Sequence, residues 1–428
     1  MSSKSSKTKP SLIIGPPDWD IRFPEFQHLA ISNGASVYTM TSNKPKLCYF
    51  EFVFENGRVT EHKKLASRVT VNQIQEGTLH HTSKEIADFF DFYGCSYSIH
   101  ADLDFTVIAV SCLQRHVEKV ILFVIELLTE PIFPEENLQK AKVFYISQLQ
   151  HQLSEPDFVS YREFTAQVYG PDSIYGYNSE RETFEALNRN DLIQYHRDHF
   201  TAERLKVFYC GDPIEHGLNF WEETLRTIPK QTQLIRHPFI IPEYQKAKAH
   251  FPMASCMQIS LKYGKKLFPK THPDYFGMYM VNTILGDYFG SRLMKNIREE
   301  HGFTYDIHST IDAQLHDGCF YISAELNAEF LDETIAQINK EIKKLKEEAI
   351  PDFELNMVKN YLNGHVLRLV DGSFPAMQFL KILITEFNTV EAFQSLVHKI
   401  KTIDQQEIME LSEKYLCEDD MTVITAGA

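Results

Sequence analysis

The chain has 428 residues, 43% hydrophobic and 24% charged, which predicts a folded protein of about two domains. Its formal net charge of −15 disfavours nucleic acid or an anionic membrane as the main partner, because both attract clustered Lys and Arg. No apolar run approaches the ~20 residues of a membrane-spanning helix, so we expect no membrane span.

Residues 1–24 are expected to form a flexible leader. The first residues are rich in Ser and Lys and lack the apolar core of a secretory signal. A transit peptide is the less favoured alternative, because this stretch lacks an amphipathic pattern. The seven cysteines are odd in number and widely spread, which favours a reducing, cytoplasmic location.

Hydrophobic periodicity predicts two successive sets of elements in the same order. The first set has strands at 46–55, 97–112 and 204–210, with helices at 60–76, 83–93, 114–129, 135–152 and 189–199. The second set has strands at 256–263, 305–325 and 421–427, with helices at 272–287, 290–300, 328–348, 352–370 and 389–415.

An internal repeat relates the two sets. Residues 191–212 align without gaps on residues 407–428, and each segment predicts a helix followed by a buried strand. Asn188 and Asp404 precede these helices as N-cap residues. We therefore predict an α+β fold of two homologous halves, each a mostly antiparallel sheet with helices packed on one face. The predicted boundaries are 25–212 and 246–428 for the two domains, with a linker at 213–245 that contains several prolines.

Nearly all of the chain after about residue 25 resembles a known protein family. The segment from Leu285 to Tyr305, LGDYFGSRLMKNIREEHGFTY, resembles the second-domain signature of the pitrilysin and insulinase family of zinc metallopeptidases. This family includes the mitochondrial processing peptidase and the core subunits of the respiratory bc1 complex. The resemblance implies that the chain forms one half of a metallopeptidase clamshell.

The segment 65–78, LASRVTVNQIQEGT, resembles the active-site helix of this family, and we expect a degenerate zinc-site helix at 63–76. The family's His-x-x-Glu-His motif falls on Arg68, Val71 and Asn72. A cation, an alkyl group and an amide cannot replace two imidazoles and a carboxylate base. The family's distal Glu is expected near 144–149, where FYISQL has no carboxylate. We predict that this chain has no metal ligand or catalytic residue of its own and is inactive alone.

Two other histidine pairs are candidates for metal ligands. His196 and His199 lie one helical turn apart, and a solvent-exposed or packing role is favoured for them. The adjacent His80 and His81 are expected to point to different sides of a loop before a helix capped by Ser83. We assign a metal to neither pair.

Arg298 and Tyr305 match the family's substrate-binding pair, an Arg followed seven residues later by a Tyr. The resemblance implies that both side chains bind the peptide backbone beside a zinc ion held by the partner polypeptide. In the alternative interpretation, Arg298 is a last-turn helix cation and Tyr305 a core aromatic residue. The equivalent residues in the repeat are Phe90 and Tyr97, so Arg298 carries more of the functional expectation than Tyr305.

These features predict the non-zinc subunit of a heterodimeric, insulinase-like metalloendopeptidase that degrades or processes peptides. Its expected partner is a homologous subunit that holds the zinc, and this chain is expected to bind no cofactor. The alternative is a non-catalytic scaffold subunit that resembles the bc1 core proteins.

Overall fold

The computed structural model describes residues 21–42, 46–231, 242–254 and 256–428. Most of the predicted leader and the centre of the predicted linker lie outside the described residues. The linker range also contains helix α8 (Gly217–Leu225), whose Trp221 and Leu225 pack into the core of the first half. The domain boundaries stay a prediction.

A six-stranded sheet forms the centre of the first half, in the order β1-β2-β6-β3-β5-β4. Its strands are β1 (Gln27–Ala30), β2 (Ser36–Thr41), β3 (Leu47–Phe54), β4 (Ser96–Ala101), β5 (Thr106–Leu113) and β6 (Leu205–Gly211). Strands β2 and β6 are parallel, and the other neighbouring strands are antiparallel. The predicted strand at 97–112 is the hairpin of β4 and β5, because the chain turns at 102–105.

The second half contains a five-stranded sheet in the order β7-β11-β8-β10-β9. Its strands are β7 (Lys248–Pro252), β8 (Ile259–Leu267), β9 (Thr304–Ala313), β10 (Gly318–Leu326) and β11 (Thr422–Gly427). The one parallel pair, β7 with β11, corresponds to β2 with β6, and the antiparallel neighbours follow in the same sequence order. The predicted α+β fold of two homologous halves is therefore confirmed.

Helices follow the strands in corresponding places of the two halves. The first half has α1 (Ala66–Gln73), α2 (Ser83–Phe92), α3 (Val117–Thr129), α4 (Glu135–Gln152), α5 (Pro156–Tyr169), α6 (Arg181–Ala186) and α7 (Arg189–His199). The second half has α9 (Tyr275–Leu285), the π-helical segment η5 (Met294–Glu300), α10 (Leu331–Glu347), α11 (Asp352–Leu369), α12 (Ser373–Glu386), α13 (Glu391–Thr402) and α14 (Gln405–Tyr415). Asn188 and Asp404 cap α7 and α14 as predicted.

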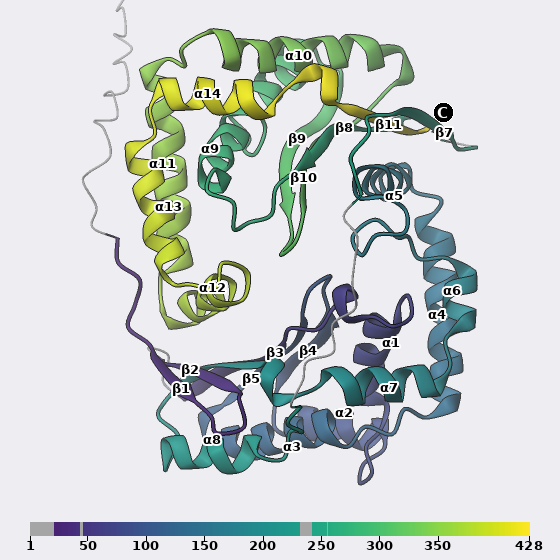
Figure 1. Cartoon of the computed structure of the whole chain (residues 1–428), viewed down its shortest axis with the longest axis vertical. Coiled ribbons are helices and arrows are strands. Elements are labelled where there is room, and N and C mark those ends of the chain that lie inside the picture. The colour runs from purple at the N-terminus through teal and green to yellow at the C-terminus, as the bar shows by residue number, and fades with distance from the viewer. Residues whose placement is uncertain (1–20, 43–45, 232–241, 255) are drawn as a thin grey trace, which may run out of the picture.

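The two halves exchange one helix each (Figure 1). Helix α12, from the second half, packs Met377 and Leu380 against Val53 and Phe208 on the first sheet. Helix α5, from the first half, covers β8 and β11 of the second sheet. Its apolar contacts are made by Phe164, Val168 and Tyr169 with Cys319 and Ile424. Each sheet is thus covered on one face by helices of its own half and on the other by a helix of the opposite half.

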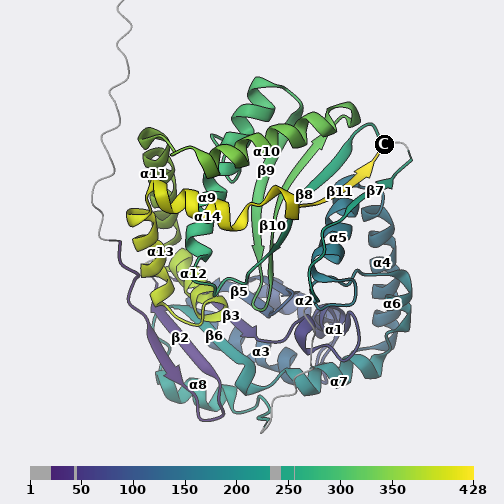
Figure 2. The ribbon, with the colours of Figure 1, turned by 45° about the horizontal axis from the view of Figure 1, so that its top comes forward.

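Helices α4 and α11 run between the halves on opposite sides of the molecule, as two views show (Figure 1, Figure 2). Each is followed directly by one of the exchanged helices, α5 or α12. In the described part of the chain, no helix is both long and apolar enough to cross a membrane.

Candidate functional site

Helix α1 places the degenerate zinc-site positions, and a buried carboxylate holds its first turn. Leu65 adopts a left-handed backbone conformation with φ of 70° just before the helix. The Glu61 carboxylate accepts hydrogen bonds from the backbone N–H groups of Leu65 and Ser67, at 3.2 and 2.9 Å. It therefore satisfies amide groups that lack partners within the helix. Burial raises the pKa of Glu61 above its ordinary value.

The three positions of the missing motif have different surroundings. The Val71 side chain is fully buried in the core of the first half. The Arg68 guanidinium lies 5.5 Å from the ring centroid of Tyr145, and Asn72 lies beside the Tyr145 hydroxyl. Tyr145 lies on α4, within the segment where the distal Glu was expected. The chain therefore brings the two expected ligand segments together, although with other side chains.

These side chains do not fit a zinc ion. Arg68 cannot act as a ligand, and the Asn72 amide is a poor ligand for zinc. Burial raises the pKa of Tyr145 above its ordinary value, which disfavours a phenolate ligand. Across the described residues there is no group of three or more His, Cys, Asp or Glu side chains that could hold a metal.

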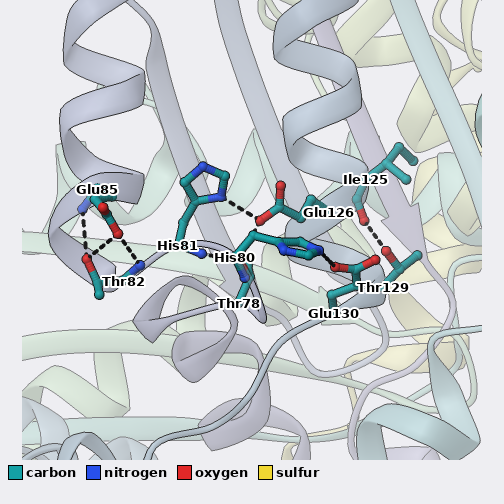
Figure 3. Close-up of polar contacts among 9 residues, drawn as sticks. All are labelled: Thr78, His80, His81, Thr82, Glu85, Ile125, Glu126, Thr129 and Glu130. Carbon is teal, nitrogen blue, oxygen red and sulfur yellow. Dashed lines mark hydrogen bonds and ion pairs between the residues drawn. The ribbon is translucent and has the colours of Figure 1, made fainter.

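His81 pairs with a carboxylate in the last turn of α3, and His80 pairs with Glu130, the residue that follows this helix (Figure 3). His80 Nε2 lies 3.0 Å from Glu130 Oε2, and His81 Nδ1 lies 2.7 Å from Glu126 Oε1. The expectation that the two rings point to different sides is wrong, because both rings reach carboxylates at the C-terminal end of α3. The N-cap of α2 is Thr82, one residue before the predicted Ser83.

His196 has a packing role. Its Nε2 lies 2.8 Å from the Leu128 carbonyl oxygen, and its ring stacks on Phe200 with centroids 4.8 Å apart. Burial lowers the pKa of His196 to about 4, so the ring is neutral and donates its N–H to that carbonyl.

Arg298 and Tyr305 lie on either side of a turn at Gly302. Arg298 belongs to the π-helical segment η5, and Tyr305 lies near the start of β9, the edge strand of the second sheet. π-Helical turns inside helices are frequent at functional sites. The Tyr305 side chain is 89% exposed, and the Arg298 guanidinium lies 4.9 Å from the ring centroid of the exposed Phe289.

No side-chain hydrogen bond or ion pair joins Arg298 or Tyr305 to another residue in the described part of the chain. The equivalent pair in the first half behaves differently, because Phe90 and Tyr97 stack with ring centroids 4.0 Å apart. Phe90 is buried and Tyr97 is partly buried. Residues at the same seven-residue spacing thus pack against each other in the first half. In the second half they are an Arg and a Tyr that can contact another molecule.

Sequence reasoning missed the contact of Arg68 and Asn72 with Tyr145. The sequence signal for this contact is Tyr145, which lies in the segment 144–149 where the family has its distal Glu. The absence of a carboxylate was visible from the sequence, whereas the replacement contact depends on how α1 and α4 pack.

Comparisons with known proteins agree on the family. Residues 186–362 match the family described as the peptidase M16 inactive domain. The chain is 21% identical to the uncharacterized zinc protease YmxG of Bacillus subtilis, over 80% of this chain and 84% of that protein. It is also 21% identical to the non-peptidase homolog YmxG of Helicobacter pylori, over 72% of each chain.

A solved structure shows the same fold. The crystal structure of a peptidase M16 inactive domain from Pseudomonas fluorescens superposes with a TM-score of 0.86 and 20% sequence identity. The match covers 94% of this chain and 98% of that one. Both halves, and the helices exchanged between them, therefore belong to a known architecture.

Proposed function

Because this chain belongs to the peptidase M16 family, the pitrilysin and insulinase family, we propose that it is the non-zinc subunit of a heterodimeric metalloendopeptidase. In this proposal a homologous subunit supplies the zinc site, and this chain binds the peptide substrate through Arg298 and Tyr305. None of the seven cysteines, all within the described residues, forms a disulfide, which supports a cytoplasmic location for the complex.

The observation that carries the proposal is that neither Arg298 nor Tyr305 has a polar side-chain partner among the described residues and that Tyr305 is exposed. A structural Arg is usually tied to a carboxylate or carbonyl, and a structural Tyr is usually at least half buried. Here Tyr305 is 89% exposed, and the guanidinium of the partly buried Arg298 lies over the ring of the exposed Phe289, with no carboxylate or carbonyl partner for it among the described residues. An exposed Tyr and a partly buried Arg near an edge strand, neither with a polar side-chain partner among the described residues, are suited to contact another molecule.

The chemistry of the pair suits a peptide backbone. The guanidinium offers several N–H donors to a carbonyl oxygen, and the Tyr305 hydroxyl can donate to the same region. Because β9 is an edge strand, its free backbone groups lie beside Tyr305 and can pair with an extended peptide. Donors directed at a carbonyl also stabilise the negative charge that develops there during hydrolysis.

The test is co-expression of this chain with a homologous chain that has an intact His-x-x-Glu-His motif, followed by peptide-cleavage assays. We expect Arg298→Ala to lower kcat/KM by about 100-fold and Tyr305→Phe by about tenfold, since single donors to a developing oxyanion have effects of this order. Arg197→Ala and Tyr361→Phe are matched controls, because both residues are exposed and lie on other helices, α7 and α11. The controls should retain the full rate.

Two results would contradict the proposal. If Arg298→Ala and Tyr305→Phe assembled normally and cleaved peptides at the unaltered rate, the pair would have no substrate-binding role and the scaffold interpretation would be favoured. If the purified chain alone bound one equivalent of zinc and cleaved peptides, it would not be the non-zinc subunit.

A further inference from the structure

A cavity of about 210 Å³ opens beside Arg68, between α1, α4, α5 and the segment 174–179. Its lining contains three arginines and two glutamines but neither Asp nor Glu. The hydroxyls of Tyr161, Tyr175 and Tyr177 in the same wall already donate to Asp312, Asp104 and Glu61 outside it. The wall includes Arg58, Arg68, Arg162, Tyr145, Gln148 and Gln152. In a chain with 58 acidic and 43 basic residues, three arginines without an acidic residue in one cavity wall favour an anionic occupant.

The three guanidinium groups are not equally available. Arg162 forms ion pairs with Glu163 and Glu180. Arg58 donates to the carbonyl oxygen of Tyr177 at 3.0 Å and lies over the Tyr177 ring. Arg68 contacts the face of Tyr145, and no carboxylate of the described residues lies within ion-pair distance of it.

A second cavity, of about 540 Å³, is also lined by Arg68. The three acidic residues in its wall form no ion pair with Arg68. Two of these acidic residues already have hydrogen-bond or ion-pair partners. Asp104 accepts hydrogen bonds from the Tyr175 hydroxyl at 2.5 Å and the Leu315 N–H at 3.1 Å. Glu386 forms an ion pair with Lys270. The third, Asp102, is exposed and lies 3.8 Å from His100.

We propose that Arg68 and the acid-free cavity bind a carboxylate, at the place where the family's zinc motif would otherwise stand. The planar guanidinium pairs with the two carboxylate oxygens, and the Tyr145 ring supports its other face. Amide N–H donors of Gln148 and Gln152 lie in the same wall. The cavity is smaller than a typical drug-sized pocket of about 300 Å³ or more, so it suits a small acid or the end of a peptide.

The carboxylate has two possible sources, a free dicarboxylic acid or the acidic end or side chain of a peptide. Isothermal titration of the purified full chain distinguishes them with three probes: glutarate, an acetylated tripeptide acid and the same tripeptide as its C-terminal amide. We expect at least one of the two acids to bind, and the tripeptide amide to bind at least about tenfold more weakly than the acid if the peptide is the source.

The variant that tests the site is Arg68→Gln, which keeps a polar side chain of similar length without the charge. We expect it to weaken carboxylate binding by at least about tenfold, and Arg68→Lys to have an intermediate effect, because the ammonium lacks the planar fork. Arg181→Gln is the matched control, because Arg181 is exposed on α6 and lies outside this cavity. Thermal melts of each variant show whether the fold is retained.

Three outcomes would overturn the inference: no binding of either acid at millimolar concentration, equal binding of tripeptide acid and amide without binding of glutarate, or unchanged binding by folded Arg68→Gln. The inference stands apart from the proposed function, since Arg298→Ala should leave carboxylate binding unchanged. Failure of one proposal is therefore distinguishable from failure of the other.

Discussion

Burial of His196 makes the stability of the first half depend on pH. The folded chain lowers the pKa of this ring to about 4, whereas an unfolded chain has a His pKa near ~6.5. The unfolded state therefore binds a proton more readily, so the contribution to stability is complete above pH ~6.5 and is lost as the pH falls toward ~4. The shift corresponds to at most about 3 kcal/mol, and the partial solvent contact of the ring reduces this value.

The measurement is urea unfolding of the natural chain and of His196→Gln at about pH 7 and about pH 4.5. Gln retains a donor for the Leu128 carbonyl but does not titrate in this range. We expect the variant to lose less free energy of unfolding between the two pH values. His216→Gln, at an exposed residue, should follow the natural chain. Identical pH dependence in all three proteins would show that His196 does not control this loss.

Single residues were predictable from the sequence where the chemistry of one side chain decided the outcome. The loss of the zinc motif at Arg68, Val71 and Asn72 is visible without coordinates. The alternative interpretation of Tyr305 as a core aromatic residue is wrong, because the side chain is exposed. An aromatic residue in a strand pattern does not reveal whether its strand is an edge strand or which neighbours cover it.

At the scale of elements, the repeat predicted most strands and helices but not the exchanged helices α5 and α12. Both were absent from the predicted elements. Each lies between a sheet of the opposite half and other elements, so its apolar residues do not form a single stripe. Local periodicity also cannot tell which of two similar sheets a helix will cover.

Each exchanged helix forms an ion pair with the sheet that it covers, and the two ion pairs have opposite polarity. Glu51 of β3 lies opposite Phe208 of β6 in the first sheet. Lys262 of β8 lies opposite Ile424 of β11 in the second sheet. Because residues 191–212 align on 407–428, Glu51 and Lys262 occupy equivalent positions with opposite charges. Lys381 of α12 lies 2.9 Å from Glu51, and Asp157 of α5 forms an ion pair with Lys262.

Packing α5 on the first sheet instead would bring Asp157 toward Glu51, and packing α12 on the second sheet would bring Lys381 toward Lys262. Like charges in such buried places are unfavourable by several kcal/mol. The two ion pairs therefore favour the exchanged arrangement of α5 and α12.

We predict that Lys381→Met destabilises the chain by about 3–5 kcal/mol, because it leaves the buried Glu51 carboxylate without its cation. The double variant Glu51→Gln with Lys381→Met should recover part of this loss, since the uncompensated charge is then removed. Lys140→Met is the control, because its pair with Glu136 is exposed and screened by solvent, so its loss should be small. Urea unfolding measures all three. A loss for Lys381→Met as small as that of the control would contradict the prediction.

At the scale of the whole molecule, the helix exchange makes each half dependent on the other. Without α12, the face of the first sheet that carries Val53 and Phe208 would be open to water. Without α5, the face of the second sheet that carries Cys319 and Ile424 would be open in the same way. Exposed apolar faces of this kind favour aggregation, so neither half is expected to be a stable protein alone.

We therefore predict that residues 1–231 and residues 242–428 are insoluble or unfolded when each fragment is expressed separately, and that co-expression gives a soluble complex. The intact chain should unfold in one transition, with circular dichroism and tyrosine fluorescence changing together, because loss of either half removes a covering helix from the other. The Lys381→Met variant should weaken association of the co-expressed fragments, whereas Lys140→Met should not. Two separate transitions, or a soluble and folded fragment on its own, would show that the exchanged helices contribute little to cooperativity. A single transition would mean that the cavity beside Arg68 and the pair Arg298 and Tyr305, which lie in different halves, are held by one cooperative structure.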